Sequence, residues 1–149
     1  MFDLKNLKDI RKDYFDNQKE LSKKIGVSYE AYAKYEQGIS IPTLETIYNF
    51  SKYYKINIDF LLGIKEKRIT TNYGNYDKRL IANNLRMLRI SKNLSQRGLS
   101  IKLNITQSAI HRYENGLSNP SLKVLYQYYK IFDFSFDGLC TKKFKNNIS

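Results

Sequence analysis

The sequence is poor in the residues on which most catalytic and metal sites depend. It has one cysteine, Cys140, which excludes an internal disulfide and a thiolate-rich zinc site, and one histidine, His111, which leaves little for acid–base chemistry. It has no glycine-rich phosphate loop and no nucleophile paired with a histidine. We therefore expect no enzyme activity, no bound metal and no cofactor.

Long apolar runs are also absent. No stretch of about 18 apolar residues occurs, so we expect no membrane span and no membrane partner. The first residues, Met-Phe-Asp-Leu-Lys, lack the apolar core of a secretory signal. These absences favour a soluble, cytoplasmic protein.

Acidic residues are scarce relative to basic ones. The 149 residues include 26 Lys and Arg but only 14 Asp and Glu, which gives a formal charge of +12 and a pI near 9.7. With 42% apolar and 27% charged residues, the composition is that of a globular protein rather than a disordered one. Such an excess of positive charge favours a polyanionic partner.

An internal repeat divides the chain. The segment Tyr35–Gly38 recurs as Tyr113–Gly116, an offset of 78 residues, and the same offset joins the only two prolines, Pro42 and Pro120. This period is too long for a solenoid repeat and indicates two copies of one small domain. We predict a first domain over 1–63, a polar linker over 64–76, a second domain over 77–141 and a basic tail over 142–149.

Each copy is predicted to form five short helices and no strand. In the second copy, Ile81, Leu85 and Leu88 have the spacing of an amphipathic helix. The helix starts expected there are Asp77, Ser95, Thr106 and Ser121, with a turn at Asn104 and a stop at Gly116. The first copy follows the same plan, with caps at Asn17, Ser28 and Thr43, turns at Gly26 and Gly38, and a last helix over 57–62.

Two short helices joined by a tight turn, the second ending at glycine, have the spacing of a helix-turn-helix. The stretch 94–116, followed by Pro120, resembles the lambda-repressor-like helix-turn-helix of the Cro/C1 type (XRE family). The resemblance covers about 60 residues in each copy. It implies an all-α fold with two five-helix helix-turn-helix domains in tandem.

The resemblance also implies roles in DNA binding. The recognition helix, 106–115, would place Gln107 and Ser108 against base edges, and glutamine can bond adenine through two hydrogen bonds. His111 and Arg112, one turn further on, would reach bases or backbone. The residues that would contact phosphate oxygens are Ser95, Gln96, Thr106, Asn115 and Ser118.

Matching positions in the first copy form a second candidate DNA site. Its residues are Gln18, Ser28, Tyr29 and Lys34. Glu30, beside them, would be repelled by phosphates, although a carboxylate can accept a hydrogen bond from cytosine N4. The resemblance further implies two structural ion pairs, Arg11–Glu36 and Arg89–Glu114.

The charge is unevenly divided between the copies. Residues 1–63 carry 10 basic and 9 acidic residues, whereas residues 64–149 carry 16 and 5. Because phosphate neutralisation supplies most non-specific affinity, the second copy should dominate DNA binding. The sequence leaves two roles open for the first copy: a weaker reader of a different half-site, or a dimerisation and partner module using Ile39 and Ile41 if they are exposed.

These observations predict a sequence-specific, double-stranded DNA-binding transcriptional regulator, a repressor of phage or mobile-element type. The alternative is a protein-interaction or antitoxin-like module whose first domain binds a protein. The expected partners are therefore double-stranded DNA, together with either a second copy of the chain or another protein.

Overall fold

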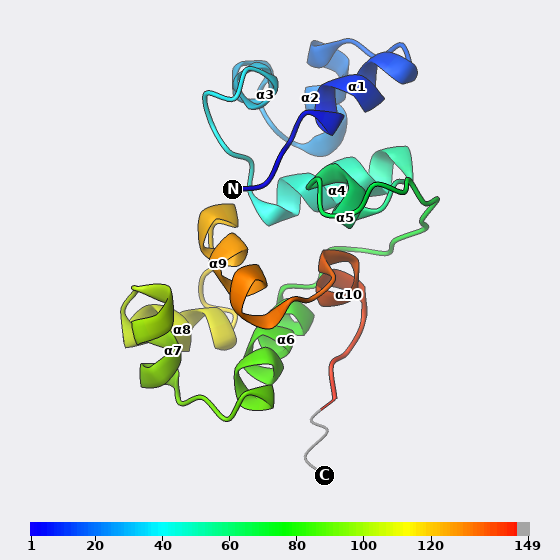
Figure 1. The fold of residues 1–149 in the computed structure, drawn as a ribbon. Coiled ribbons are helices and arrows are strands. Elements are labelled where there is room, and N and C mark those ends of the chain that lie inside the picture. Colours follow the sequence, from blue (N-terminus) through cyan, green and yellow to red (C-terminus); the bar gives the residue numbers. More distant parts are fainter. Residues whose placement is uncertain (146–149) are drawn as a thin grey trace. The chain divides into compact units, whose positions relative to one another are not determined.

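The computed structural model describes residues 1–145, and within that range it contains ten helices and no strand (Figure 1). The chain divides into two compact units, Met1–Tyr76 and Asp77–Ser149. The predicted all-α class is confirmed. No helix in the described part has the length and apolarity needed to cross a membrane.

Unit 1 contains α1 (Asn6–Asp13), α2 (Gln18–Ile25), α3 (Tyr29–Glu36), α4 (Leu44–Tyr54) and α5 (Ile58–Leu61). Its core receives one apolar stripe from each helix, since apolar residues three or four apart lie on one helix face. The core side chains with at most 2% exposure include Leu7, Ile10, Leu21, Ile25, Tyr32, Ile47, Phe50 and Leu61.

Unit 2 repeats this plan with α6 (Lys78–Ser91), α7 (Gln96–Leu103), α8 (Gln107–Glu114), α9 (Leu122–Phe132) and α10 (Phe136–Thr141). Its core includes Leu85, Leu99, Ile110, Leu125, Tyr128, Phe136 and Leu139. Cys140 is buried there as a packing residue.

The helix boundaries follow local signals in the sequence. A side-chain oxygen caps the helix start at every predicted position, by accepting a hydrogen bond from a backbone N–H of the first turn. These caps are Asn17, Ser28, Thr43, Asp77, Ser95, Thr106 and Ser121. Gly26, Gly38 and Gly116 follow helix ends with φ of 78°, 72° and 69°, a conformation that glycine adopts without strain.

Residues 64–76, predicted to be a linker, fold onto unit 1. The backbone N–H of Thr71 donates to the carbonyl of Lys55 (3.0 Å). The ring of Tyr73 stacks on Tyr48 of α4 with centroids 5.5 Å apart, and the Tyr48 hydroxyl donates to the carbonyl of Gly74 (2.8 Å). The segment thus covers part of α4. This packing could not be predicted, because the sequence of the segment has no helical periodicity.

The start of the predicted tail is also anchored. Asn84 of α6 is fully buried, and its side-chain amide nitrogen donates to the carbonyls of Leu139 (2.8 Å) and Lys142 (2.6 Å). Its amide oxygen accepts from the N–H of Phe144 (2.8 Å). Residues 146–149 of the predicted tail lie outside the described residues.

Candidate nucleic-acid interface

Each unit contains two consecutive helices joined by a tight turn, α2–α3 and α7–α8. The first helix of each pair ends in the left-handed conformation, at Gly26 in unit 1 and at Asn104 (φ 53°) in unit 2. Asparagine tolerates this conformation better than most residues, so both sequences make the same turn. The second helix, α3 or α8, then begins after its own Ser or Thr cap.

A buried ion pair holds α8 against α6. The guanidinium of Arg89 donates from Nε to Glu114 Oε1 (2.6 Å) and from Nη2 to Oε2 (3.1 Å). The third donor, Nη1, bonds the carbonyl of Leu94, just before α7 (2.8 Å). The Glu114 side chain is only 2% exposed, so the pair fixes the end of α8 from inside the unit.

We call this arrangement, an Arg that binds both a Glu and a backbone carbonyl, the lock. Unit 1 forms the same lock. Arg11 binds Glu36 at 2.6 and 3.0 Å and the carbonyl of Asp16 at 2.9 Å. Both ion pairs implied by the resemblance are therefore present. Burial favours the neutral form of Glu36, but hydrogen bonds from Arg11 and Gln18 outweigh it and hold the pKa of this carboxyl below its ordinary value.

Gln18 and Gln96, predicted to contact phosphate, are the third members of these locks. The amide nitrogen of Gln18 donates to Glu36 Oε2 (2.7 Å), and that of Gln96 donates to Glu114 Oε2 (3.0 Å). One of the two amide hydrogens is thus engaged, and the other remains for a phosphate oxygen. The resemblance alone did not indicate this second role.

The exposed face of α8 carries the predicted base-reading residues. Gln107, Ser108, His111 and Arg112 are all exposed, whereas Ala109 and Ile110 of the same helix are buried. Positions separated by four residues share one helix face, so the exposed four form one continuous surface. The side chain of Thr106, at the helix start, accepts from the N–H of Ala109 (3.1 Å) and keeps its hydroxyl hydrogen for an outside acceptor.

Two more residues were predicted to contact phosphate: Asn115, which is exposed, and Ser118, which is half-buried. The amide nitrogen of Asn115 donates back to the carbonyl of His111 (2.7 Å), at the end of α8. The hydroxyl oxygen of Ser118 is hidden from solvent and has no hydrogen-bond partner in the described part of the chain. A phosphate contact through Ser118 would therefore require its side chain to rotate outward.

Lys19 and Arg97 were not predicted as site residues. Each is exposed and is the second residue of α2 or α7, where the first backbone N–H groups are unpaired. A cation at this position opposes the helix dipole and is mildly destabilising, whereas beside a bound phosphate it is favourable. The 78-residue offset that relates the two would have singled them out.

Unit 1 presents a comparable but less basic face. Tyr29 is 47% exposed, and Glu30 and Lys34 beside it on α3 are also exposed. A shallow hollow at the start of α2 is lined by Arg11, Asn17, Gln18, Lys19 and Tyr29. Ile39 (67% exposed) and Ile41 lie on the surface in the loop after α3.

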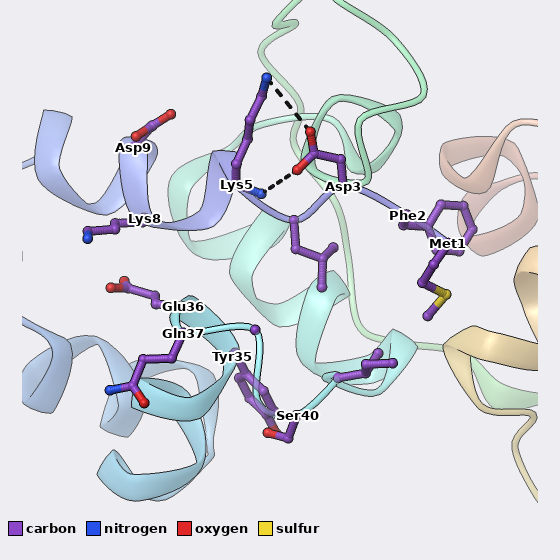
Figure 2. A pocket seen from close by; sticks show the side chains of 13 residues that line it. Met1, Phe2, Asp3, Lys5, Lys8, Asp9, Tyr35, Glu36, Gln37 and Ser40 are labelled. Atoms are coloured by element: carbon purple, nitrogen blue, oxygen red, sulfur yellow. Dashed lines mark hydrogen bonds and ion pairs between the residues drawn. The ribbon is translucent and has the colours of Figure 1, made fainter.

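Another hollow in unit 1 lies between the N-terminal segment, α1 and the end of α3 (Figure 2). Lys5, which lines it, bonds Asp3 through both its backbone N–H and its ammonium group. Glu36, at its rim, is already paired with Arg11. Because this hollow lies outside the α2–α3 pair except at the end of α3, we locate the candidate site on the helix-turn-helix faces instead. Within the described residues no cluster of three or more His, Cys, Asp or Glu could hold a metal ion.

Comparison with known proteins agrees with this geometry. The family model described as "Helix-turn-helix" matches residues 7–61 and 85–139, which is most of the chain. The chain therefore belongs to the helix-turn-helix family of the Cro/C1 type, with two family domains in tandem.

One relative among curated proteins is the cryptic phage CTXphi transcriptional repressor RstR of Vibrio cholerae. It is 36% identical over 63 residues, which are 42% of this chain and 57% of the relative. The chain thus spans little more than half the length of that relative. No solved structure matches the chain significantly.

Proposed function

We propose that this protein is a sequence-specific, double-stranded DNA-binding transcriptional repressor of phage or mobile-element type, and that α8 enters the major groove. The exposed face of α8, formed by Gln107, Ser108, His111 and Arg112, carries this proposal. The similarity to a phage transcriptional repressor supports repression as the outcome.

The chemistry of this face suits base edges. A major groove about 12 Å wide admits an α-helix, and Gln107 at the start of α8 can bond adenine N6 and N7 together. Arg112, one turn further along, can reach guanine or a phosphate. The lock between Arg89 and Glu114 keeps these side chains on a rigid element, which specific recognition requires.

Phosphate contacts then orient the helix. Arg97 and the first N–H groups of α7 form one contact, and the hydroxyl of Thr106 forms another. Unit 2 carries 13 basic and 4 acidic residues, whereas unit 1 carries 13 and 10. Unit 2 should therefore supply most of the electrostatic affinity. Since the proposed target is DNA, we place the protein in the cytoplasm.

A gel-shift titration of the full chain, repeated over a range of salt concentrations, tests the proposal. The probes are duplexes recovered from a random pool by binding. We expect affinity to fall linearly with salt on a log–log scale, since counterions are released from each neutralised phosphate. Failure to bind any duplex, or binding without a salt slope, would contradict it.

A protein-interaction role for unit 1 has one observation in its favour, the exposure of Ile39 and Ile41. However, the equivalent of Ile39 in unit 2, Leu117, is 70% exposed as well. An apolar residue at this position is therefore a feature of both units. It does not by itself distinguish a partner-binding unit from a DNA-binding one.

A further inference from the structure

The two units have the same internal contacts around the helix-turn-helix, but different side chains on its exposed face. In both, an Arg–Glu pair (2.6 Å) and a Gln (2.7 Å in unit 1, 3.0 Å in unit 2) hold the second helix of the helix-turn-helix. Both second helices have eight residues, and a hydroxyl side chain caps each start. Equivalent contacts therefore hold helices α3 and α8 in their units.

Exposed cations at two positions of the helix-turn-helix are retained in both units. Lys19 corresponds to Arg97 at the start of the first helix, and Lys34 corresponds to Arg112 on the second. All four are exposed, and no ion pair engages any of them within the described residues. A cation at a helix start costs stability unless an anion binds there, so Lys19, the second residue of α2, favours phosphate contact by unit 1 also.

The positions that would face base edges differ instead. The substituted pairs are Tyr29 for Gln107, Glu30 for Ser108 and Ala33 for His111. A module that binds only protein has no need of the retained cations, whereas a second DNA reader needs those cations and a new set of base contacts. Retained cations together with changed base-facing residues therefore favour a role for unit 1 as a second DNA reader.

We propose that α3 also enters a major groove, and that one chain reads two unlike half-sites, so that its target is not palindromic. This rests on the proposed function, which concerns α8. In the half-site of unit 1, Glu30 accepts a hydrogen bond from cytosine N4. Its carboxylate is exposed in the first turn of α3, where the helix dipole stabilises a negative charge.

Selection of bound duplexes from a random pool, followed by sequencing, tests this with the full chain. We expect an enriched site that contains two different half-site motifs. The same selection is then repeated with Glu30→Gln and with Gln107→Ala. Each variant should change one half of the motif and leave the other intact, and Glu30→Gln should reduce the preference for cytosine at one position by about ten-fold.

Glu66→Gln is the matched control, because it removes the same charge from an exposed position of unit 1 outside the helix-turn-helix. It should leave both motifs unchanged. All three substituted residues are exposed, so each variant should fold, and circular dichroism verifies this.

A palindromic motif, or a single half-site that Glu30→Gln does not alter, would overturn the inference while leaving the DNA-binding function of α8 intact. Recovery of no enriched duplex would instead contradict the proposed function itself. An equal change of both half-sites by Glu30→Gln would also overturn the inference, because it would show a general electrostatic effect.

Discussion

At the scale of single residues, Phe15 stands out in the turn between α1 and α2. It is 95% exposed and has a φ of 58°, a left-handed conformation that an aromatic residue adopts at a cost of about 1–2 kcal/mol. The equivalent residue of unit 2 is Asn93, with a φ of 54°. The same left-handed turn is thus made by Phe15 in unit 1, which adopts this conformation at a cost, and by Asn93 in unit 2, which tolerates it.

We therefore expect Phe15→Asn to raise the free energy of unfolding of unit 1 by about 1 kcal/mol, because asparagine tolerates this conformation. Native-state hydrogen exchange, which reports on each unit separately, measures the change. The reciprocal variant Asn93→Phe should destabilise unit 2 by a similar amount. Loss of protection in unit 1 with Phe15→Asn would show that the Phe15 ring makes a stabilising contact.

Gln107 and Arg97 differ in what they are proposed to read. Gln107→Ala should lower affinity for the preferred duplex by about 1–3 kcal/mol and relax the preference at one base pair. Arg97→Ala should weaken all duplexes by a similar factor, since a phosphate contact carries no sequence information. Competition binding with single-base variants of the selected site distinguishes the two. A uniform effect of Gln107→Ala would place it on the backbone.

At the scale of the elements, the lock between α1 and α3 depends on a charge. The pKa of Glu36 is below its ordinary value in the folded chain, so its contribution to stability is present above the unfolded value of about 4.3 and is lost as pH falls through the lower folded value. Arg11, whose side chain is only 12% exposed, would then lose its partner.

Glu36→Gln should lower the free energy of unfolding of unit 1 at neutral pH by about 3 kcal/mol, because Arg11 is left without its counter-charge. Denaturant titrations at a series of pH values should also show a weaker loss of stability in acid than in the parent chain. Unchanged stability at neutral pH would mean that the lock does not hold α3 in place. An unchanged acid response would mean that other carboxylates control it.

The elements also show what the sequence could and could not predict. Caps such as Ser95 and Thr106 were predictable because a cap and its N–H partner are three residues apart in the chain. The contact of Tyr73 with Tyr48 was not, because two aromatic rings 25 positions apart give no periodic signal. Likewise, the bond from Gln96 to Glu114 crosses between helices, so a motif could identify Gln96 but not its partner.

At the scale of the whole molecule, charge separates the two units. Unit 1 has a net charge of +3 and unit 2 a net charge of +9. If both units dock on DNA, each should neutralise phosphates. The slope of log affinity against log salt should then reflect the sum of the phosphates neutralised by the two units. Lys19 and Arg97 offer one matched cation in each unit.

We expect Lys19→Ala and Arg97→Ala each to reduce the slope of log affinity against log salt by about 1, and the double variant to reduce it by about 2. Binding titrations at four or more salt concentrations give the slope. Lys65→Ala, which removes an exposed cation outside the helix-turn-helix, should leave it unchanged. A slope that responds to Arg97→Ala but not to Lys19→Ala would confine DNA contact to unit 2.

The packing of residues 64–76 on α4 determines how the chain can be dissected. A fragment that ends at residue 63, where the internal repeat ends, would lack Tyr73, which stacks on Tyr48, and Gly74, whose carbonyl accepts a hydrogen bond from the Tyr48 hydroxyl. A fragment that ends at Tyr76 keeps both. The smallest stable fragment of unit 1 should therefore be longer than the repeated sequence. Limited proteolysis should cut after residues 64–76 rather than within them.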